Sequence, residues 1–330
     1  MTVVGQRTAT VAVAGVGATG ARAARQLVGC AEVDEVLLSG HGERPAAMRR
    51  SLGDRASLAD PLDATGAVVL AGATSSQLEL ARKAVQAGLH VVSTSDAVDD
   101  VVALLDLHDL AVARGVSVVA GAAFAPGLTC VLARHLRGWL DTVEEIHVAR
   151  FGTGGPACAR QHHDALSTRT ADWRDGEWSR RQAGSGRELC VFPDPVGSID
   201  CYRAALPDPV LLHRAFPEAE RITARQAANR RQRLTAWLPM LRRPHPEGRI
   251  GAVRVEVRGR RDGVCVTEVA GVIDRPAVAA GAVAGLTVRH AVADAFVPGA
   301  YGLASVVDST AFLHELAAVG VRAAVFVGST

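Results

Sequence analysis

Lysine is almost absent from this sequence. Of its 36 basic residues only Lys83 is a lysine, and the others are arginines. Chemistry that needs a lysine amine, such as a Schiff base or a phosphate-loop lysine, must therefore use Lys83 or be excluded. The net charge of +2 in 330 residues also lacks the concentrated positive charge by which nucleic-acid and membrane-surface proteins bind phosphate. We expect a small-molecule partner and neither nucleic acid nor membrane.

Metal-finger and disulfide patterns are missing as well. The six cysteines are scattered without a C-x-x-C pair, at Cys30, Cys130, Cys158, Cys190, Cys201 and Cys265. No H-E-x-x-H occurs, and the His162-His163 pair shows no cysteine or acid at a recognised ligand spacing, so we expect no metal site. The longest small-apolar run, 277–288, is shorter than the roughly 20 residues of a membrane helix. With no secretory signal recognised at the amino terminus, we expect a reduced, cytoplasmic protein.

Short apolar segments alternate with helix-forming segments in the first half of the chain. This alternation predicts an α/β fold, a Rossmann-type doubly wound parallel sheet with a ligand crevice at the carboxyl ends of its strands. Helices are expected at 21–28, 76–87 and 98–114. The predicted strands are 10–14, 35–39, 67–71, 89–93 and 117–120.

A glycine-rich turn, GVGATG at 15–20, directly follows the first predicted strand and precedes a helix. A G-x-G-x-x-G string alone is weak evidence, and a purely structural turn is the alternative, but the order of strand, turn and helix is the one that dinucleotide-binding folds use. Gly17 would let the backbone approach a diphosphate, and Gly20 would let the helix pack on the strand. We therefore expect the amide groups of this helix to bind a dinucleotide.

The end of the second predicted strand bears on the choice of dinucleotide. Ser39 stands where an acidic residue would bind the NAD ribose, and Arg44 follows closely enough to pair with a 2′-phosphate. We therefore predict NADP as the preferred cofactor, with NAD possible; an exposed arginine face is the alternative. The predicted cofactor-binding residues share the carboxyl edge of the sheet: Gly15, Gly17, Ala18, Thr19, Gly20, Ser39, Arg44, Gly72, Ala73, Thr74, Ser95, Gly121, Ala122 and Phe124.

Four further segments carry a family resemblance. AGLHVVSTSD at 87–96 and GAAFAPGL at 121–128, with GSGREL at 184–189 and FPDP at 192–195, resemble the saccharopine dehydrogenase-like oxidoreductases, in particular bacterial members of unassigned substrate. The resemblance implies an NAD(P)-dependent enzyme acting at a carbon–nitrogen bond, typically an imine formed from an amino acid's amine and a carbonyl partner. It also implies a carboxyl-terminal segment that returns to the nucleotide domain. Unlike this chain, members acting on saccharopine itself commonly have a larger substrate domain and, in one branch, a lysine acid/base.

The second half alternates apolar and polar residues with a period near two. This pattern predicts a mainly antiparallel sheet with strands at 143–151, 221–227, 252–258 and 264–272, the last two joined by a turn at Asp262-Gly263. Helices are expected at 276–295 and 309–318, and 321–327 could be a strand or a helix end. We predict a dinucleotide-binding domain at 1–138, a substrate and dimerisation domain at 139–296, and a returning segment at 297–330. We expect a homodimer.

Four residues are candidates for proton transfer. His162 and His163 lie in a polar, glycine-flanked stretch, and an adjacent pair facing opposite ways would present at most one imidazole to a cleft. Tyr202 could donate from its hydroxyl, although a buried, hydrogen-bonded tyrosine is the simpler interpretation. Asp96 could act as a base or as a helix cap.

Arginines could hold a substrate carboxylate through two parallel hydrogen bonds. We prefer Arg187, in a glycine-rich loop, over Arg231, which belongs to a cluster that also reads as a solvated basic face.

Together these features predict an oxidoreductase that moves a hydride to or from an imine or amine carbon of a small, carboxylated, amino-acid-like metabolite. A carbonyl or sugar-alcohol dehydrogenase and a non-catalytic NADP-sensing regulator are the alternatives. Short-chain dehydrogenases are excluded because Leu206, not a lysine, follows Tyr202 by four residues. Oxidoreductases of the glucose-fructose type commonly have a lysine before a proline at the position of residues 93–96. This chain has STSD there, which argues against that type.

Overall fold

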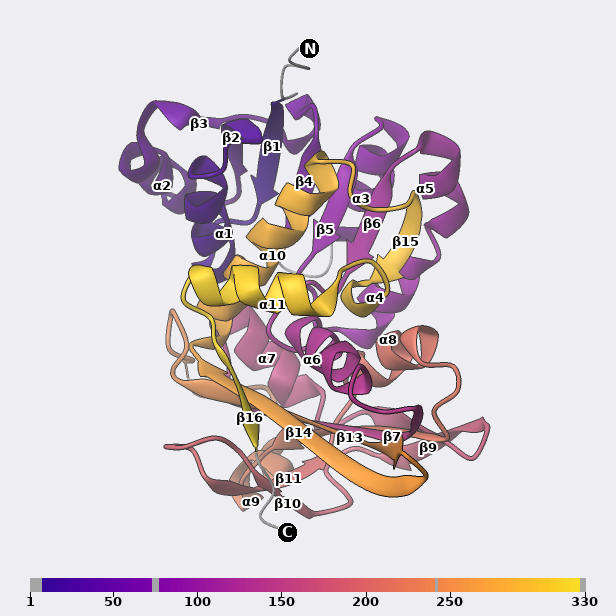
Figure 1. Ribbon diagram of the computed structural model, residues 1–330. Helices are drawn as coiled ribbons and strands as arrows, with labels where there is room; N and C mark the ends of the chain where they lie inside the picture. Colours follow the sequence, from indigo (N-terminus) through magenta and orange to yellow (C-terminus); the bar gives the residue numbers. More distant parts are fainter. Residues whose placement is uncertain (1–7, 73–76, 241–242, 327–330) are drawn as a thin grey trace.

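The computed structural model describes residues 8–72, 77–240 and 243–326. Two β-sheets lie one above the other in Figure 1, with helices α6 (Leu128–Arg137) and α7 (Pro156–Asp164) between them. The first sheet and its helices form the upper part, where the chain begins, and the second sheet forms the lower part. Among the described residues, no helix is both long and apolar enough to cross a membrane.

The first sheet is parallel throughout its described part, in the order β3-β2-β1-β4-β5-β6-β15. The chain starts in the middle at β1 and builds outward in both directions, which confirms the predicted Rossmann-type doubly wound sheet. Its strands are β1 Ala9–Ala14, β2 Val33–Ser39, β3 Ala56–Leu58, β4 Ala67–Leu70, β5 His90–Ser93, β6 Ser117–Ala120 and β15 Gly299–Gly302.

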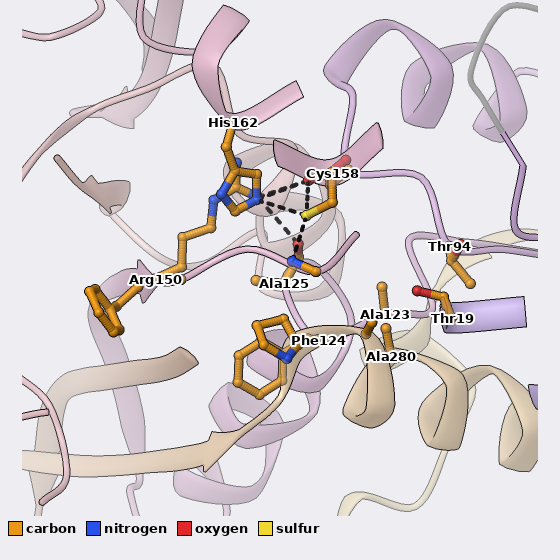
Figure 2. A pocket seen from close by; sticks show the side chains of 15 residues that line it. Thr19, Thr94, Ala123, Phe124, Ala125, Arg150, Cys158, His162 and Ala280 are labelled. Atoms are coloured by element: carbon orange, nitrogen blue, oxygen red, sulfur yellow. Dashed lines mark hydrogen bonds and ion pairs between the residues drawn. The ribbon is translucent and has the colours of Figure 1, made fainter. Parts of the chain in front are cut away.

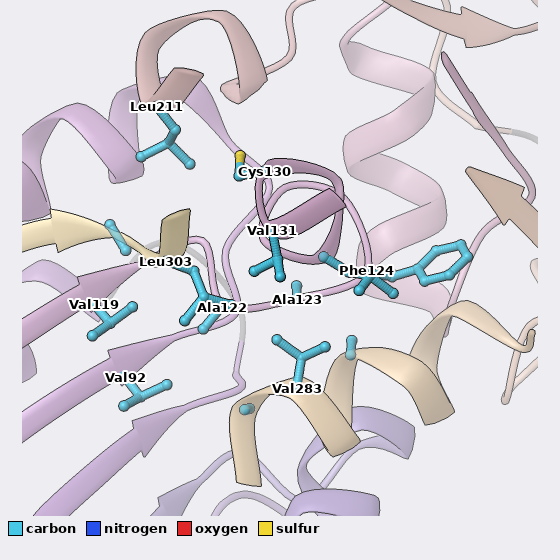
Figure 3. Packing of buried hydrophobic residues seen from close by; sticks show 14 of the residues in the cluster. Val92, Val119, Ala122, Ala123, Phe124, Cys130, Val131, Leu211, Val283 and Leu303 are labelled. Carbon is cyan, nitrogen blue, oxygen red and sulfur yellow. The ribbon is translucent and has the colours of Figure 1, made fainter. Parts of the chain in front are cut away.

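Helices cover both faces of this sheet, and its central strands are largely apolar because the helices shield them from water. Every residue of β4 and of β6 is buried. The helices are α1 Ala18–Val28, α2 Arg44–Leu52, α3 Gln77–Gln86, α4 Val98–Leu105, α5 His108–Arg114 and α10 Pro276–Val292, with short 3₁₀ turns at Gly53–Arg55 and Pro61–Asp63. Figure 3 shows Val92 and Val119 of the strands converging with Val131 of α6 and Val283 of α10.

The single helix predicted at 98–114 is wrong. Helix α4 ends at Leu105 and α5 begins at His108. The turn between them buries Leu107 at 2% exposure, and it lets α4 pack against β6 and α5 against β15. Helix propensity alone does not reveal that the chain changes direction here, at the buried Leu107.

The second sheet is mixed but mostly antiparallel, as predicted, and its described part is nine-stranded. The order is β10-β11-β12-β7-β13-β14-β16, with β8 and β9 as a side branch from β12; β12 and β7 are parallel. The predicted turn is confirmed, because Asp262 and Gly263 have φ values of 52° and 77°. The strands are β7 Thr142–Phe151, β8 Arg169–Arg174, β9 Glu177–Gln182, β10 Glu188–Val191, β11 Ser198–Arg203, β12 Arg221–Ala227, β13 Gly251–Arg261, β14 Val264–Asp274 and β16 Ala323–Phe326.

The carboxyl-terminal part of the chain contributes to both sheets. Helix α10 packs on α1, where Gly281 leaves so little space that a Cβ would lie 2.6 Å from the Thr19 carbonyl oxygen. Strand β15 pairs with β6, and β16 pairs with β14 of the second sheet. The domain boundaries at 138 and 296 stay predictions. The remaining helical segments are α8 Asp208–Ala215, α9 Arg230–Thr235, the 3₁₀ turn Leu303–Ser305 and α11 Ser309–Ala318.

Candidate active site

A cavity of about 60 Å³ lies at the carboxyl edge of the first sheet, where that sheet faces the second. The loops after β5 and β6, the end of β7 in the second sheet with the loop after it, and helices α1, α7 and α10 line it: Thr19, Thr94, Asp96, 123–125, 150–152, Gly154, Cys158, His162, Pro276, Ala277 and Ala280. In Figure 2, Thr19, Thr94 and Ala280 gather at one end, whereas His162, Cys158 and Arg150 lie at the other.

The glycine turn forms the Thr19 end of the cavity. Gly15 has a φ of +104°, and a Cβ there would lie 2.4 Å from the Gly72 nitrogen. At Gly20 a Cβ would lie 1.9 Å from the Gly15 carbonyl oxygen, so helix α1 packs against the turn only because the side chain is absent. A Cβ at Gly17 would meet nothing within 4 Å. Gly17 is also the N-cap of α1 and no side chain caps the helix there, so the exposed amides and the open space suit an anion such as a diphosphate.

The other predicted cofactor residues fall along the same edge of the sheet. Ser39 ends β2, and Arg44, which is exposed, begins α2. Gly72 follows β4, whereas Ala73 and Thr74 lie outside the described residues. The Ser95 side chain makes its hydrogen bonds within its own segment: its Oγ accepts from the Ala97 amide at 3.3 Å and donates to Asp100 at 2.7 Å. After β6 come Gly121, with a φ of +70°, Ala122 and Phe124, and of these Phe124 lines the cavity.

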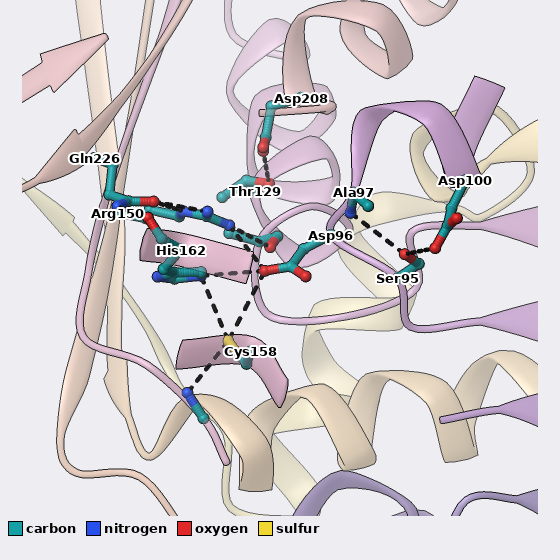
Figure 4. Close-up of polar contacts among 12 residues, drawn as sticks. Ser95, Asp96, Ala97, Asp100, Thr129, Arg150, Cys158, His162, Asp208 and Gln226 are labelled. Carbon is teal, nitrogen blue, oxygen red and sulfur yellow. Dashed lines mark hydrogen bonds and ion pairs between the residues drawn. The ribbon is translucent and has the colours of Figure 1, made fainter. Parts of the chain in front are cut away.

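Four polar side chains meet at the opposite end of the cavity. The Asp96 Oδ2 atom lies 3.1 Å from His162 Nε2 and 3.3 Å from Arg150 Nη1. The Cys158 Sγ atom lies 3.4 Å from His162 Nε2 and donates weakly to Asp96 Oδ2 at 3.8 Å. Figure 4 shows these groups converging from the loop after β5, from the end of β7 and from α7. We call Asp96, Arg150, Cys158 and His162 the polar cluster.

Neighbouring groups hold the polar cluster in place. Arg150 is only 2% exposed and donates to Gln226 Oε1 from Nε at 3.2 Å and from Nη2 at 2.8 Å. The Gln226 amide in turn donates to the His162 carbonyl oxygen at 2.8 Å. The Gly154 amide donates to Cys158 Sγ at 3.4 Å. Because each side chain has more than one fixed contact, the cluster is preorganised.

Burial and mutual charge set the protonation states of the polar cluster. Burial, followed by the positive charge of Arg150, lowers the pKa of His162 to about 4. Burial and the nearby Asp96 charge raise the pKa of the Cys158 thiol to about 12. Burial by itself would raise the pKa of Asp96, but the His162 hydrogen bond and the Arg150 charge outweigh it and lower that pKa. At neutral pH the cluster therefore holds a carboxylate and a guanidinium beside a neutral imidazole and a neutral thiol.

The structure brings two of the four predicted proton-transfer residues, Asp96 and His162, to the cavity. Asp96 does not serve as the N-cap of α4, which is Ala97. His163 points elsewhere, with its Nε2 atom 2.8 Å from the Leu238 carbonyl oxygen. Tyr202 is buried, does not line the cavity, and lies 4.0 Å beneath the Arg233 guanidinium.

Neither predicted carboxylate clamp lines the cavity. The Arg187 side chain is 70% exposed and pairs with Asp200 at 3.0 Å. Arg231 lies on α9 and is exposed. Among the described cavity-lining residues, Arg150 is the arginine.

Sequence reasoning missed Cys158 and Arg150. Residues 156–164, within the polar, glycine-flanked stretch, form helix α7, with Pro156 in its first turn. The statement that no cysteine stands at ligand spacing from the His162-His163 pair is therefore wrong, because Cys158 precedes His162 by one helical turn and shares its face. Nothing in the sequence distinguished Arg150 from the many other arginines, because almost all basic residues of this chain are arginine.

The fold has relatives among solved structures, while no family model matches the chain. An apo saccharopine dehydrogenase (L-Glu forming) from Saccharomyces cerevisiae is 15% identical over 97% of this chain and 100% of its own, with a TM-score of 0.69. A DAP dehydrogenase from C. glutamicum, in complex with DAP, is 12% identical over 94% of this chain and 96% of its own, with a TM-score of 0.51. The chain therefore has a saccharopine dehydrogenase-like fold, as the sequence motifs predicted.

Proposed function

We propose that this protein is an NAD(P)-dependent oxidoreductase, with NADP preferred, that acts on an imine or amine of a small carboxylated metabolite. One observation supports the proposal most: a single cavity joins Thr19, at the start of α1, to Asp96 and His162. A dinucleotide at the α1 amides and a reacting group at the polar cluster would thus meet in one cavity.

The residues around the glycine turn fit a nicotinamide dinucleotide. Gly17 leaves open space over the α1 amides for the diphosphate. Ser39, at the end of β2, and Arg44, at the start of α2, would give the ribose 2′-phosphate of NADP room and positive charge. The bound nicotinamide would supply or accept the hydride. The apolar side chains of Phe124, Phe151 and Ala280 line the same cavity and would limit water there.

The polar cluster would receive the heteroatom and the carboxylate of the substrate. Arg150 is a buried guanidinium in the cavity wall, and within the described part of the chain its Nη1 atom has only long contacts, at 3.3 Å to Asp96 and 3.4 Å to the Ala125 carbonyl. A substrate carboxylate would give Arg150 Nη1 a shorter, charge-assisted hydrogen bond. The names of the fold neighbours, a saccharopine dehydrogenase that forms L-Glu and a DAP dehydrogenase, support an amino-acid-like substrate.

Cofactor binding tests the first half of the proposal. Titrating NADPH and NADH by fluorescence should show saturable binding, with NADPH the tighter ligand. Gly17→Ala should weaken NADPH at least about tenfold while leaving the melting temperature unchanged, because its Cβ meets no protein atom within 4 Å. Equal affinity of the wild type and Gly17→Ala would contradict the proposed diphosphate position, and tenfold tighter NADH would contradict the role of Ser39.

Turnover tests the second half. NADPH oxidation should be followed with a panel of keto acids and amines, and in reverse with amino acids. His162→Ala should lower kcat at least about 100-fold, whereas His163→Ala, one residue away but outside the cavity, should keep normal rates. Turnover of uncharged alcohols in preference to the amino-acid panel would favour a carbonyl or alcohol dehydrogenase instead.

A further inference from the structure

Three potential metal-ligand atoms face one another in the polar cluster. Asp96 Oδ2, Cys158 Sγ and His162 Nε2 all lie within 4.8 Å of one another. They come from two segments distant in sequence, the loop after β5 and one face of α7, and the cavity adjoins all three residues. Figure 4 shows the three side chains pointing toward a common centre.

The separations match those around a tetrahedral zinc ion. Zn–N, Zn–O and Zn–S bonds of about 2.0, 2.1 and 2.3 Å place the ligand atoms about 3.3 to 3.6 Å apart. The structure has 3.1 Å between the nitrogen and the oxygen, 3.4 Å between the sulfur and the nitrogen, and 3.8 Å between the sulfur and the oxygen. Each value lies within a few tenths of an ångström of this geometry, so an ion could enter with little rearrangement.

The three contacts of the triangle outnumber the hydrogens available for hydrogen bonds. His162 Nε2 carries at most one hydrogen, the Cys158 thiol carries one, and the ionised Asp96 carboxylate carries none. At most two hydrogens therefore serve three contacts, so one contact must share a hydrogen with another or set two lone pairs against each other. A cation at the centre would accept all three lone pairs at once.

We propose that Asp96, Cys158 and His162 bind one Zn²⁺ ion. A thiolate, an imidazole and a carboxylate form a borderline donor set that suits this ion, and the two anionic ligands offset its charge. Binding requires the Cys158 thiol to release its proton to solvent, because the thiolate is the ligand. Three protein ligands leave a fourth position for water or substrate, which is the arrangement of catalytic zinc sites.

Neighbouring groups already donate hydrogen bonds to two of the proposed zinc ligands. The Gly154 amide donates to Cys158 Sγ at 3.4 Å, which stabilises a thiolate, and Arg150 donates to Asp96 Oδ2 at 3.3 Å, which orients the carboxylate. The ion would hold the reacting heteroatom of the substrate as a Lewis acid. This role rests on the proposed function, whereas binding of the ion itself does not.

Metal content tests the site directly. Wild-type protein freed of metal with a chelator and dialysed against Zn²⁺ should retain one ion per chain by elemental analysis. Cys158→Ala and His162→Ala should weaken Zn²⁺ by more than the about 10–100-fold that loss of a supporting residue costs. Cys265→Ala, which removes an exposed thiol, and His163→Ala are the matched controls and should bind as the wild type does.

Co²⁺ provides a second readout that needs no variant. Wild-type protein loaded with Co²⁺ should show the intense d–d bands of a tetrahedral ion and a sulfur-to-cobalt charge-transfer band, and Cys158→Ala should lose the latter. Failure of the wild type to retain Zn²⁺, or equal retention by Cys158→Ala and Cys265→Ala, would overturn the site. NADPH titration of the same samples separates this failure from failure of the proposed cofactor site at α1.

Discussion

The two sheets bury different kinds of side chain. In the first sheet the buried polar residues on strands are serines, Ser93 and Ser117, each 0% exposed. The second sheet buries full charges, at Arg150, Arg225 and Glu256, with exposures of 2%, 4% and 7%. These charges are paired: Arg225 lies 3.4 Å from Asp172, and Arg258 donates to Glu256 at 2.6 Å.

Under the proposed function, this difference separates two tasks. The first sheet offers an anion the backbone amides of α1 and needs no charged side chain to do so. The second sheet brings Arg150 to the cavity, where a fixed charge can orient a reacting group. Glycine geometry should therefore govern cofactor binding, and buried charge should govern chemistry and the stability of the second sheet.

Loss of Arg150 should have the largest effect on stability. Arg150→Met removes the guanidinium, which leaves the buried Asp96 carboxylate without its cationic partner and Gln226 Oε1 without its donors. We expect the free energy of unfolding in a urea titration to fall by about 3–5 kcal/mol. Arg187→Ala, which removes an exposed arginine from its pair with Asp200, should leave the midpoint unchanged. Equal effects of the two substitutions would remove the distinction between the sheets.

Glycine substitutions should have an intermediate effect, and only where the backbone is crowded. Gly20→Ala places a Cβ 1.9 Å from the Gly15 carbonyl oxygen, so α1 must move. We expect a loss of about 1–3 kcal/mol in unfolding free energy. Gly17→Ala is the matched control, with open space around its Cβ. If Gly17→Ala proves as destabilising as Gly20→Ala, the turn does not have the geometry described.

The smallest effect is a pH dependence that originates in the first sheet. His90 Nδ1 accepts a hydrogen bond from the Ser117 amide at 3.1 Å, and burial lowers the pKa of His90 despite Asp294 3.7 Å from its Nε2. The unfolded chain therefore binds this proton more readily. The contribution of neutral His90 to the stability of the fold is complete above about pH 6.5 and is lost as the pH falls through the folded-state pKa. In His90→Asn, the fall in melting temperature between pH 7 and pH 5 should be smaller than in the wild type. An unchanged fall would show that His90 is not held neutral.

Local pattern was enough to predict most of the first sheet but little of the candidate active site. Strand 117–120 and helix 309–318 were predicted with the bounds that the structure has, because continuous apolar runs and capping residues are local signals. Asp96 and His162 were identified as candidates from position and residue type. Their meeting with Cys158 and Arg150 depends on how α7 and β7 pack against the first sheet, over sequence separations of 62 and 54 residues from Asp96. No local pattern encodes such a separation.

The predicted carboxylate clamp at Arg187 shows that a local pattern can also suggest a site residue that the fold places elsewhere. A glycine-rich loop and a guanidinium are reasonable local grounds for a carboxylate site. In the fold, however, that loop lies beside β10 and β11, and Arg187 pairs with Asp200 away from the cavity.

A crystal structure with NADP⁺ tests the central claim most directly. The account predicts the diphosphate on the amides at the start of α1, beside Gly17, the 2′-phosphate near Ser39 and Arg44, and the nicotinamide ring in the cavity between Thr19 and the polar cluster. A diphosphate bound elsewhere, or a nicotinamide ring remote from Asp96 and His162, would contradict it.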